Sequence, residues 1–310
     1  MPIEQILQRL HIDSMPDGRP TLVVLLGPTG VGKTASSFVL AEQMQSPIIS
    51  ADSRQVFREL RIGSAAPTAE ELRRVTHYFI GTRSVVDNYS AGQYETDALR
   101  LLQELFQKHD ALLMVGGSMM YIDAVCRGLD DVPAILPEVR KSVQDDYNRY
   151  GLTFMQEELH RLDEKHYNEV DLKNYRRVMH AVEVCRQTGR PYSDLRRNSP
   201  KTRPFRIIKI GLNLPRELLY DRINRRVDQM IEDGLIEEAQ ALTEHRHLPA
   251  LNTVGYKELF NCFDGIWTRR QAIDMIRQDS RRYAKRQLTW FRADNEIHWF
   301  EPQQLISALS

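Results

Sequence analysis

The sequence predicts an α/β fold with a parallel sheet, into which an all-helical domain is inserted. Short apolar runs alternate with helical patterns over residues 20–131 and again over 205–310. Residues 132–204 contain only helical patterns. Because alternating strands and helices imply a parallel sheet with right-handed crossovers, we expect a discontinuous α/β core that is divided by a helical insertion domain.

Apolar runs mark the expected strands, and helical patterns follow several of them. Such short continuous runs are typical of strands buried on both faces of a parallel sheet. A helical pattern follows the first, third and fourth runs, as expected of βαβ units. The runs lie at residues 21–26, 47–52, 111–117, 205–214 and 296–300.

The insertion offers helical patterns at residues 137–150, 153–162 and 172–189. We expect the last of these helices to end at Gly189, since glycine favours the C-cap position and Pro191 follows shortly after.

The composition favours a soluble cytoplasmic protein. Of 310 residues, 42% are hydrophobic and 27% are charged. No apolar run approaches the roughly 20 residues that a membrane span needs, and the first residues lack the apolar stretch of a secretion signal. The three cysteines form no C-x-x-C pair, which fits a reducing compartment and predicts no zinc site.

Charge is balanced overall but unevenly distributed along the chain. Residues 1–171 hold 17 Lys and Arg against 25 Asp and Glu, whereas residues 172–209 hold 11 against 2. Residues 268–292 hold 8 against 2. Two basic segments on an otherwise acidic chain predict a local contact with a polyanion, although a charge run is also typical of a solvated helix face.

A phosphate-binding loop is the most specific motif. Residues 27–34, GPTGVGKT, match G-x-x-x-x-G-K-[ST] between an expected strand and an expected helix. The glycines let backbone amides surround an anion, Lys33 adds a charge, and the Thr34 hydroxyl can hold Mg²⁺. The motif predicts a P-loop NTPase-like core that binds a diphosphate or triphosphate.

Asp52 follows the second expected strand and Ser118 follows the third. The carboxyl ends of parallel strands face the ligand crevice, so a carboxylate at Asp52 can hold Mg²⁺ or accept a proton from a nucleophile. The same residues also fit plainer structures: Asp52 or Ser53 can cap a helix, and Ser118 can be an ordinary turn residue.

Several motifs together resemble those of bacterial tRNA dimethylallyltransferases, also called tRNA isopentenyltransferases. The resemblance spans about Leu22 to Trp299. Its most specific parts, besides the loop, are DSRQ (52–55), VGYKE (254–258) and RRYAKRQLTWFR (281–292). The sequence departs from the family pattern at Met119, Met120, Ala66 and His180. Met119 and Met120 fit either the wall of an apolar prenyl pocket or helix packing.

The resemblance implies a prenyl transfer in which no phosphoryl group moves. A dimethylallyl group would pass from dimethylallyl diphosphate to N6 of adenosine 37 of tRNA, and diphosphate would leave. Asp52, Lys33 and Arg226 would be catalytic, with Asp52 taking the N6 proton and Mg²⁺ near Thr34. The residues implied to bind diphosphate are Gly27, Pro28, Thr29, Gly30, Val31, Gly32, Lys33, Thr34, Arg222 and Arg226.

The family also implies a set of contacts with the anticodon stem-loop of tRNA, and we expect a monomer. The implied contacts are Asp52, Ser53, Arg54, Gln55, Ser118, Arg140, Arg176, Arg177, Val178, Met179, His180, Gly255, Tyr256 and Lys257.

Three alternatives remain open from the sequence. The chain could be a small-molecule kinase that uses ATP, with Asp52 activating a hydroxyl acceptor. It could be a non-catalytic RNA-binding protein that uses a nucleotide as a switch. It could also prenylate free adenine nucleotides, although such a small acceptor needs neither the insertion nor the basic C-terminal segment.

Overall fold

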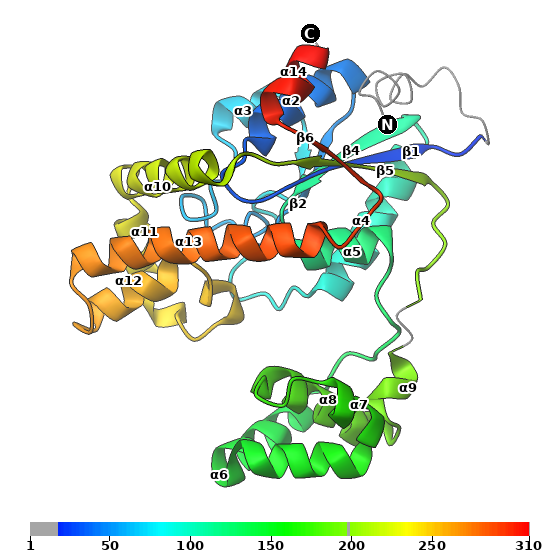
Figure 1. Ribbon diagram of the computed structural model, residues 1–310, viewed down its shortest axis with the longest axis vertical. Helices are drawn as coiled ribbons and strands as arrows, with labels where there is room; N and C mark the ends of the chain where they lie inside the picture. Colours follow the sequence, from blue (N-terminus) through cyan, green and yellow to red (C-terminus); the bar gives the residue numbers. More distant parts are fainter. Residues whose placement is uncertain (1–17, 197–198, 310) are drawn as a thin grey trace. The chain divides into compact units, whose positions relative to one another are not determined.

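The computed structural model describes residues 18–196 and 199–309. The described strands form one parallel sheet in the order β3-β2-β4-β1-β5-β6 (Figure 1). Five of them confirm the expected strands, whereas β3 was missed because two residues are too short to show a pattern. The strands are β1 (Thr21–Leu26), β2 (Ile48–Ala51), β3 (His77–Tyr78), β4 (Ala111–Gly116), β5 (Arg206–Leu212) and β6 (Ile297–Phe300).

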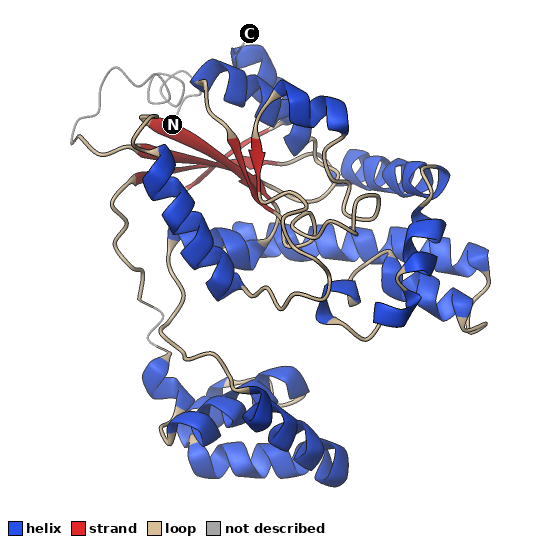
Figure 2. Cartoon of the chain, turned by 180° about the vertical axis from the view of Figure 1, so that it is seen from behind, coloured by secondary structure: helices blue, strands red, loops and turns tan. Residues whose placement is uncertain are grey.

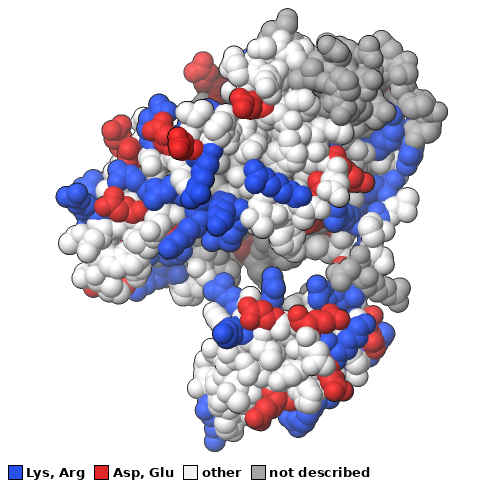
Figure 3. All heavy atoms as spheres, in the orientation of Figure 1, with Lys and Arg blue, Asp and Glu red and all other residues white. Residues whose placement is uncertain are grey.

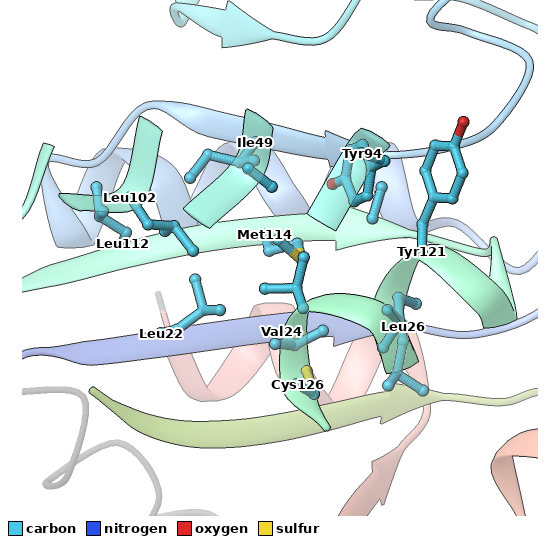
Figure 4. Packing of buried hydrophobic residues seen from close by; sticks show 14 of the residues in the cluster. Leu22, Val24, Leu26, Ile49, Tyr94, Leu102, Leu112, Met114, Tyr121 and Cys126 are labelled. Carbon is cyan, nitrogen blue, oxygen red and sulfur yellow. The ribbon is translucent and has the colours of Figure 1, made fainter. Parts of the chain in front are cut away.

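Helices cover both faces of the sheet (Figures 1 and 2). Side chains of β1 alternate between the two faces, because successive residues of a strand point in opposite directions. Val23 and Leu25 pack against α2 (Lys33–Met44), α10 (Arg216–Glu232) and α14 (Pro302–Leu309). Leu22, Val24 and Leu26 pack against α4 (Ala91–Leu105) and α5 (Met119–Cys126), as Figure 4 shows.

A third apolar cluster lies outside the two sheet faces. It joins α11 (Leu235–Ala241), α12 (Tyr256–Phe263) and α13 (Arg269–Phe291) to the segment after β2, through Val56, Phe57 and Leu60. Two short 3-10 turns, Thr243–His245 and Pro249–Leu251, connect α11 to α12, and α3 (Ala69–Arg74) precedes β3. This cluster fixes α13 alongside the segment that follows β2.

The chain divides into two compact units. The sheet unit contains the chain up to Cys126 and from Arg203 onward, and the helical unit runs from Arg127 to Thr202. The insertion expected from the sequence was 132–204. Arg203 belongs to the sheet unit because its guanidinium bonds to Glu95 Oε1 (2.7 Å) and to the carbonyls of Ala124 and Val125.

The helical unit has a core of its own. It contains α6 (Pro137–Leu162), α7 (Glu164–Glu169), α8 (Tyr175–Thr188) and α9 (Tyr192–Leu195), and Val143, Leu159 and Val182 are among its buried residues. Gly151 (φ 78°) breaks α6 at the place where two helices were expected. Gly189 (φ 64°) caps the end of α8, which confirms the expected C-cap.

Within the described ranges, none of the helices combines the length and the apolar character that a membrane crossing requires.

Candidate functional site

A cavity opens where β1, β2 and β4 end. Its volume is ≈ 450 Å³. The phosphate loop follows β1, Asp52 follows β2, and Gly117 follows β4, so three neighbouring strand ends supply its floor. This is the position at which parallel α/β sheets bind ligands. Its lining combines charged and apolar side chains, and the apolar ones are Ile223, Val227, Met230, Leu235, Val254 and Ile276.

The phosphate loop requires its glycines. Gly27, Gly30 and Gly32 have φ of 150°, 80° and 109°, where other residues are strained. A Cβ at Gly27 would lie 2.6 Å from the Leu212 carbonyl oxygen, and one at Gly30 would lie 2.8 Å from Ile223. Pro28 and Val31 are buried, so they shape the loop while their side chains stay out of the cavity.

Lys33 begins α2 and turns its ammonium group back over the loop. Its Nζ donates to the carbonyl oxygens of Gly27 (3.0 Å) and Pro28 (2.9 Å). Burial and the nearby charge of Arg226 lower the pKa of Lys33 to about 8, although Asp52 partly opposes this shift. A cation held against carbonyl groups in this way is ready to bind an anion in the loop.

Arg222 and Arg226 reach the cavity from α10, one turn apart. Arg222 donates to the Val31 carbonyl (3.3 Å). Arg226 forms no hydrogen bond or ion pair with the part of the chain that the structure describes. Burial lowers the pKa of Arg226 and the charge of Asp52 raises it again. This end of the cavity therefore concentrates positive charge, which the nearby Asp52 offsets only in part.

Asp52 fixes the turn after β2 and also lines the cavity. Its Oδ1 accepts hydrogen bonds from the backbone N–H groups of Arg54 (2.8 Å) and Gln55 (3.3 Å). The segment that follows is a turn and not a helix, so the carboxylate fixes a turn. Asp52 also lines the cavity, on the same floor as Lys33.

The turn after Asp52 is fixed from several sides. Ser118 is buried and its Oγ accepts from the backbone N–H of Ser53 (3.0 Å). This contact fits the structural alternative from the sequence, in which Ser118 is a turn residue. The Gln55 amide donates to the carbonyls of Ser64 (3.3 Å) and Ala65 (3.1 Å). Ser53, Arg54 and Gln55 all line the cavity.

Glu238 on α11 holds the loop that carries Ser64. Its carboxylate accepts from three successive backbone N–H groups, those of Arg61 (3.0 Å), Ile62 (2.8 Å) and Gly63 (2.9 Å). It also accepts from the Tyr256 hydroxyl (2.6 Å), and Tyr256 is itself buried. The sequence analysis did not single out Glu238, although the segment around it, residues 226–242, belongs to the stretches that resemble the family.

The remaining residues of the VGYKE motif have distinct places. Gly255 lines the cavity at the start of α12, where Glu258 accepts from its backbone N–H (2.8 Å). Lys257 is exposed and pairs with Asp279 on α13 (3.1 Å).

Gln287 on α13 is a second residue that the sequence did not single out. Its side chain is 2% exposed, and its Oε1 accepts from the backbone N–H of Thr29 in the phosphate loop (2.9 Å). Its Nε2 donates to the carbonyl of Gly117 (2.7 Å). Tyr283, one turn earlier, lines the cavity, where burial and the charge of Asp52 raise its pKa to about 12. Thus the basic C-terminal helix forms part of the site.

In the helical unit, the residues implied to contact tRNA fall into two groups. Arg140, Arg176, Arg177 and His180 are exposed, with Arg140 3.7 Å from Glu183. Val178 and Met179 are buried in the core of the unit, so their side chains are removed from the expected contacts. They occupy the inward positions of an amphipathic helix whose outward positions carry the cations.

The two methionines after Ser118 do not line the cavity. Met119 packs against the sheet core and Met120 is 50% exposed. Of the two alternatives left open for these positions, helix packing fits Met119, and the apolar lining residues of the cavity come mainly from α10, α11 and α13.

The site has oxygen ligands suited to Mg²⁺. The Thr34 side chain is exposed at the start of α2 and lines the cavity together with the Asp52 carboxylate. Magnesium in proteins commonly takes one or two such oxygens and completes its shell with phosphate oxygens and water. Among the described residues, no three or more His, Cys, Asp or Glu side chains cluster in a way that could hold a metal ion.

The sheet order and the phosphate loop define a protein of the P-loop α/β class. Within that class, the family model described as IPP transferase matches residues 55–294. The chain belongs to this family.

Close relatives share this assignment. The chain is 55% identical to tRNA dimethylallyltransferase 2 of Parabacteroides distasonis, over 92% of this chain and 95% of that protein. It is 56% identical to tRNA dimethylallyltransferase 2 of Porphyromonas gingivalis, over 91% of this chain and 94% of that protein. Both alignments extend over nearly the full length, so the similarity includes both units.

Solved structures show the same fold. The full-length tRNA isopentenylpyrophosphate transferase from Bacillus halodurans is 36% identical, with a TM-score of 0.67 over 94% of this chain and 95% of that one. A eukaryotic dimethylallyltransferase acting on tRNA, 21% identical, gives a TM-score of 0.78 over 91% of this chain and 74% of that one, which shows the fold alone.

Proposed function

We propose that this protein transfers a dimethylallyl group from dimethylallyl diphosphate to N6 of adenosine 37 in the anticodon loop of tRNA. The observation that carries the proposal is the composition of one cavity. It places a cationic phosphate loop, apolar side chains and the Asp52 carboxylate around a single volume. Full-length similarity to proteins named tRNA dimethylallyltransferase supports the same reaction.

The diphosphate of the donor would bind in the phosphate loop. Backbone amides of Gly30, Gly32 and the start of α2 would supply hydrogen-bond donors, while Lys33, Arg222 and Arg226 would supply charge. Thr34 would hold Mg²⁺, which supplies further positive charge to the phosphate oxygens when it is bound. The five-carbon chain would lie against the apolar side chains of the cavity, where its burial adds to affinity.

The transfer requires stabilisation of the departing diphosphate and removal of a proton from the N6 amine, which is a weak nucleophile. The bond between the allylic carbon and the diphosphate oxygen breaks, and the oxygen takes the bonding electrons. The cations and amides at that oxygen stabilise the developing charge. The N6 amine forms the new bond to carbon, and Asp52 would take the proton that N6 loses. No phosphoryl group is transferred.

The acceptor is proposed to be tRNA, because the cationic surface suits a polyanion. Figure 3 shows Lys and Arg side chains gathered on the sheet unit over α10 and α13. Arg140, Arg176, Arg177 and His180 provide exposed basic side chains on the helical unit. A loop nucleotide would swing out of its stack to enter the cavity, at a cost of a few kcal/mol. We propose that the protein acts on it as a cytoplasmic monomer.

The test combines the protein with tRNA, Mg²⁺ and labelled dimethylallyl diphosphate. Digestion of the RNA should yield a labelled, prenylated adenosine, and an equal amount of diphosphate should be released. A tRNA that carries guanosine at position 37 is the matched control and should stay unlabelled. A parallel reaction with γ-labelled ATP should transfer no phosphate to RNA or small alcohols. Phosphate transfer without prenylation would replace the proposal by the kinase alternative.

A further inference from the structure

An exposed aromatic side chain lies on the basic C-terminal helix. Trp290 is 44% exposed, although tryptophan is generally well buried in folded proteins. Its ring is held in place, because Nε1 donates a hydrogen bond to Asp123 Oδ2 on α5 (2.8 Å). Met120 is 50% exposed and precedes Asp123 by three residues, hence on the same face of α5. Trp290 and Met120 are called the Trp290 patch below.

The Trp290 patch continues from the rim of the cavity. Tyr283, Gln287 and Trp290 are spaced by four and three residues, so they follow one face of α13. Tyr283 lines the cavity, and Gln287 bonds to the carbonyl of Gly117, which also lines it. The patch therefore lies about one helical turn beyond the cavity, along the same helix.

Exposed cations without carboxylate partners precede Trp290 on α13. Arg286 lies one turn before Trp290 on the same face and Lys285 lies further round the helix, and within the described ranges neither forms an ion pair. Arg286 lies over the ring of Tyr283, 5.6 Å from its centroid. By contrast, Arg282 and Lys257 nearby are each paired with Asp279. An immobilised aromatic ring beside unpaired cations is the combination that binds unpaired nucleotides, through base stacking and phosphate contacts.

We propose that Trp290 stacks on an unpaired base of the RNA substrate, next to the nucleotide that enters the cavity. This inference rests on the proposed function and adds a contact outside the reaction itself. Removal of the target nucleotide from its stack leaves a neighbouring base without a stacking partner, and the indole ring replaces that partner. The hydrogen bond to Asp123 reduces the entropy that the ring loses on binding. A protein partner is the alternative occupant, but the unpaired cations favour RNA.

The test measures the affinity for an RNA hairpin that reproduces an anticodon stem-loop. Stacking on one aromatic residue predicts that Trp290→Ala weakens hairpin binding about 5–100-fold, while Trp290→Phe stays within about 3-fold of the parent. Ile266→Ala removes another exposed apolar side chain, one that is 64% exposed, and should change nothing. The KM for dimethylallyl diphosphate should be the same in all four proteins. Equal hairpin affinity of Trp290→Ala and the parent would overturn the inference.

A cycle with modified RNA separates stacking from a general loss of structure. Hairpins that lack one base at a time, at the positions flanking the target adenosine, are titrated into the parent and Trp290→Ala. At one position, removal of the base should weaken binding to the parent and have little effect on the variant. Equal effects on both proteins at every position would contradict stacking. Binding without prenylation by the parent would instead sink the proposed function and leave the stacking result intact.

Discussion

The two ends of the cavity are built in opposite ways. At the phosphate loop, Lys33 bonds only to carbonyl oxygens, and neither Arg222 nor Arg226 forms an ion pair with the described residues. At the other end, the polar groups of the segment from Asp52 to Ala65 already bond to one another and to the rest of the protein. Gln55 and Glu238 are the centres of that network.

The difference separates two ways of preparing a site. The loop end keeps its charge for a ligand, so its side chains should act mainly on the anionic donor. The Asp52 end has a shape set before any ligand arrives, so its side chains should act mainly on the acceptor and its proton. Preorganised groups of both kinds lower a barrier without rearranging during the reaction.

The largest effect is expected at Asp52 itself. Asp52→Ala should reduce kcat about 10²–10⁴-fold, as is usual for loss of a general base, and leave tRNA binding largely unchanged. Asp52→Asn keeps an oxygen that can accept from Arg54 and Gln55, so it tests the base without removing the turn. Single-turnover rates with saturating tRNA, measured for both variants, distinguish loss of the base from loss of the turn. Parental activity in Asp52→Asn would restrict Asp52 to the turn.

At the loop end, Arg226→Ala should lower kcat/KM for the donor about 10²–10³-fold, because it removes a positive charge that would stabilise the departing diphosphate. Arg225→Ala is the matched control. It removes the adjacent arginine, whose guanidinium pairs with Asp221 (2.5 Å) and is exposed. Comparison of both variants in one donor titration separates local charge from the general positive field. Similar losses in the two would contradict a specific role for Arg226.

A pH profile examines the same end without altering its shape. The pKa of Lys33 is lowered to about 8, so in the free protein the ammonium loses its proton above that pH. The value of kcat/KM for the donor should therefore fall above about pH 8, by up to about tenfold per pH unit. In Lys33→Arg the side chain stays charged, and this decline should disappear. A parental profile that is flat to pH 9.5 would show that Lys33 charge is dispensable.

The smallest effect is expected at Glu238, which acts through other residues. Glu238→Gln replaces one acceptor oxygen by a donor next to backbone N–H groups, and the loss of such bonds costs about 1–1.5 kcal/mol. We expect the KM for tRNA to rise about tenfold while the KM for the donor stays the same. Glu237→Gln, on the neighbouring exposed position, is the control. A change in the KM for the donor instead would contradict the assignment of the loop end to the donor and of the Asp52 end to the acceptor.

The sequence predicted the loop end of the site well, because that end is local. Eight consecutive residues between a strand and a helix fix the loop, and the periodicity of the flanking segments identifies both elements. The same holds for Asp52, which follows directly on a recognisable strand. Five of the six described strands could also be predicted, since each is long enough to show an apolar run.

The side chains that support the two ends were harder to predict, because they are distant in sequence from the groups they bond. At the loop end, Gln287 bonds to Thr29 across 258 positions, and beside the Asp52 end, Glu238 bonds to Gly63 across 175. Gln287 lies in the 281–292 motif, but neither periodicity nor composition indicates which backbone groups these two side chains bond. Val178 and Met179 were included among the tRNA contacts, although their side chains are buried. A contact motif along a helix includes positions that face the core, and the motif alone does not show which positions these are.

The order of strands has a consequence for synthesis of the protein. The central strand β1 pairs on one side with β5, so that Thr21 lies opposite Arg206. A ribosome must therefore release about 180 further residues, including the whole helical unit, before the middle of the sheet can close. Until then the nascent β1 carries an open apolar edge, which chaperones that recognise such segments would have time to bind.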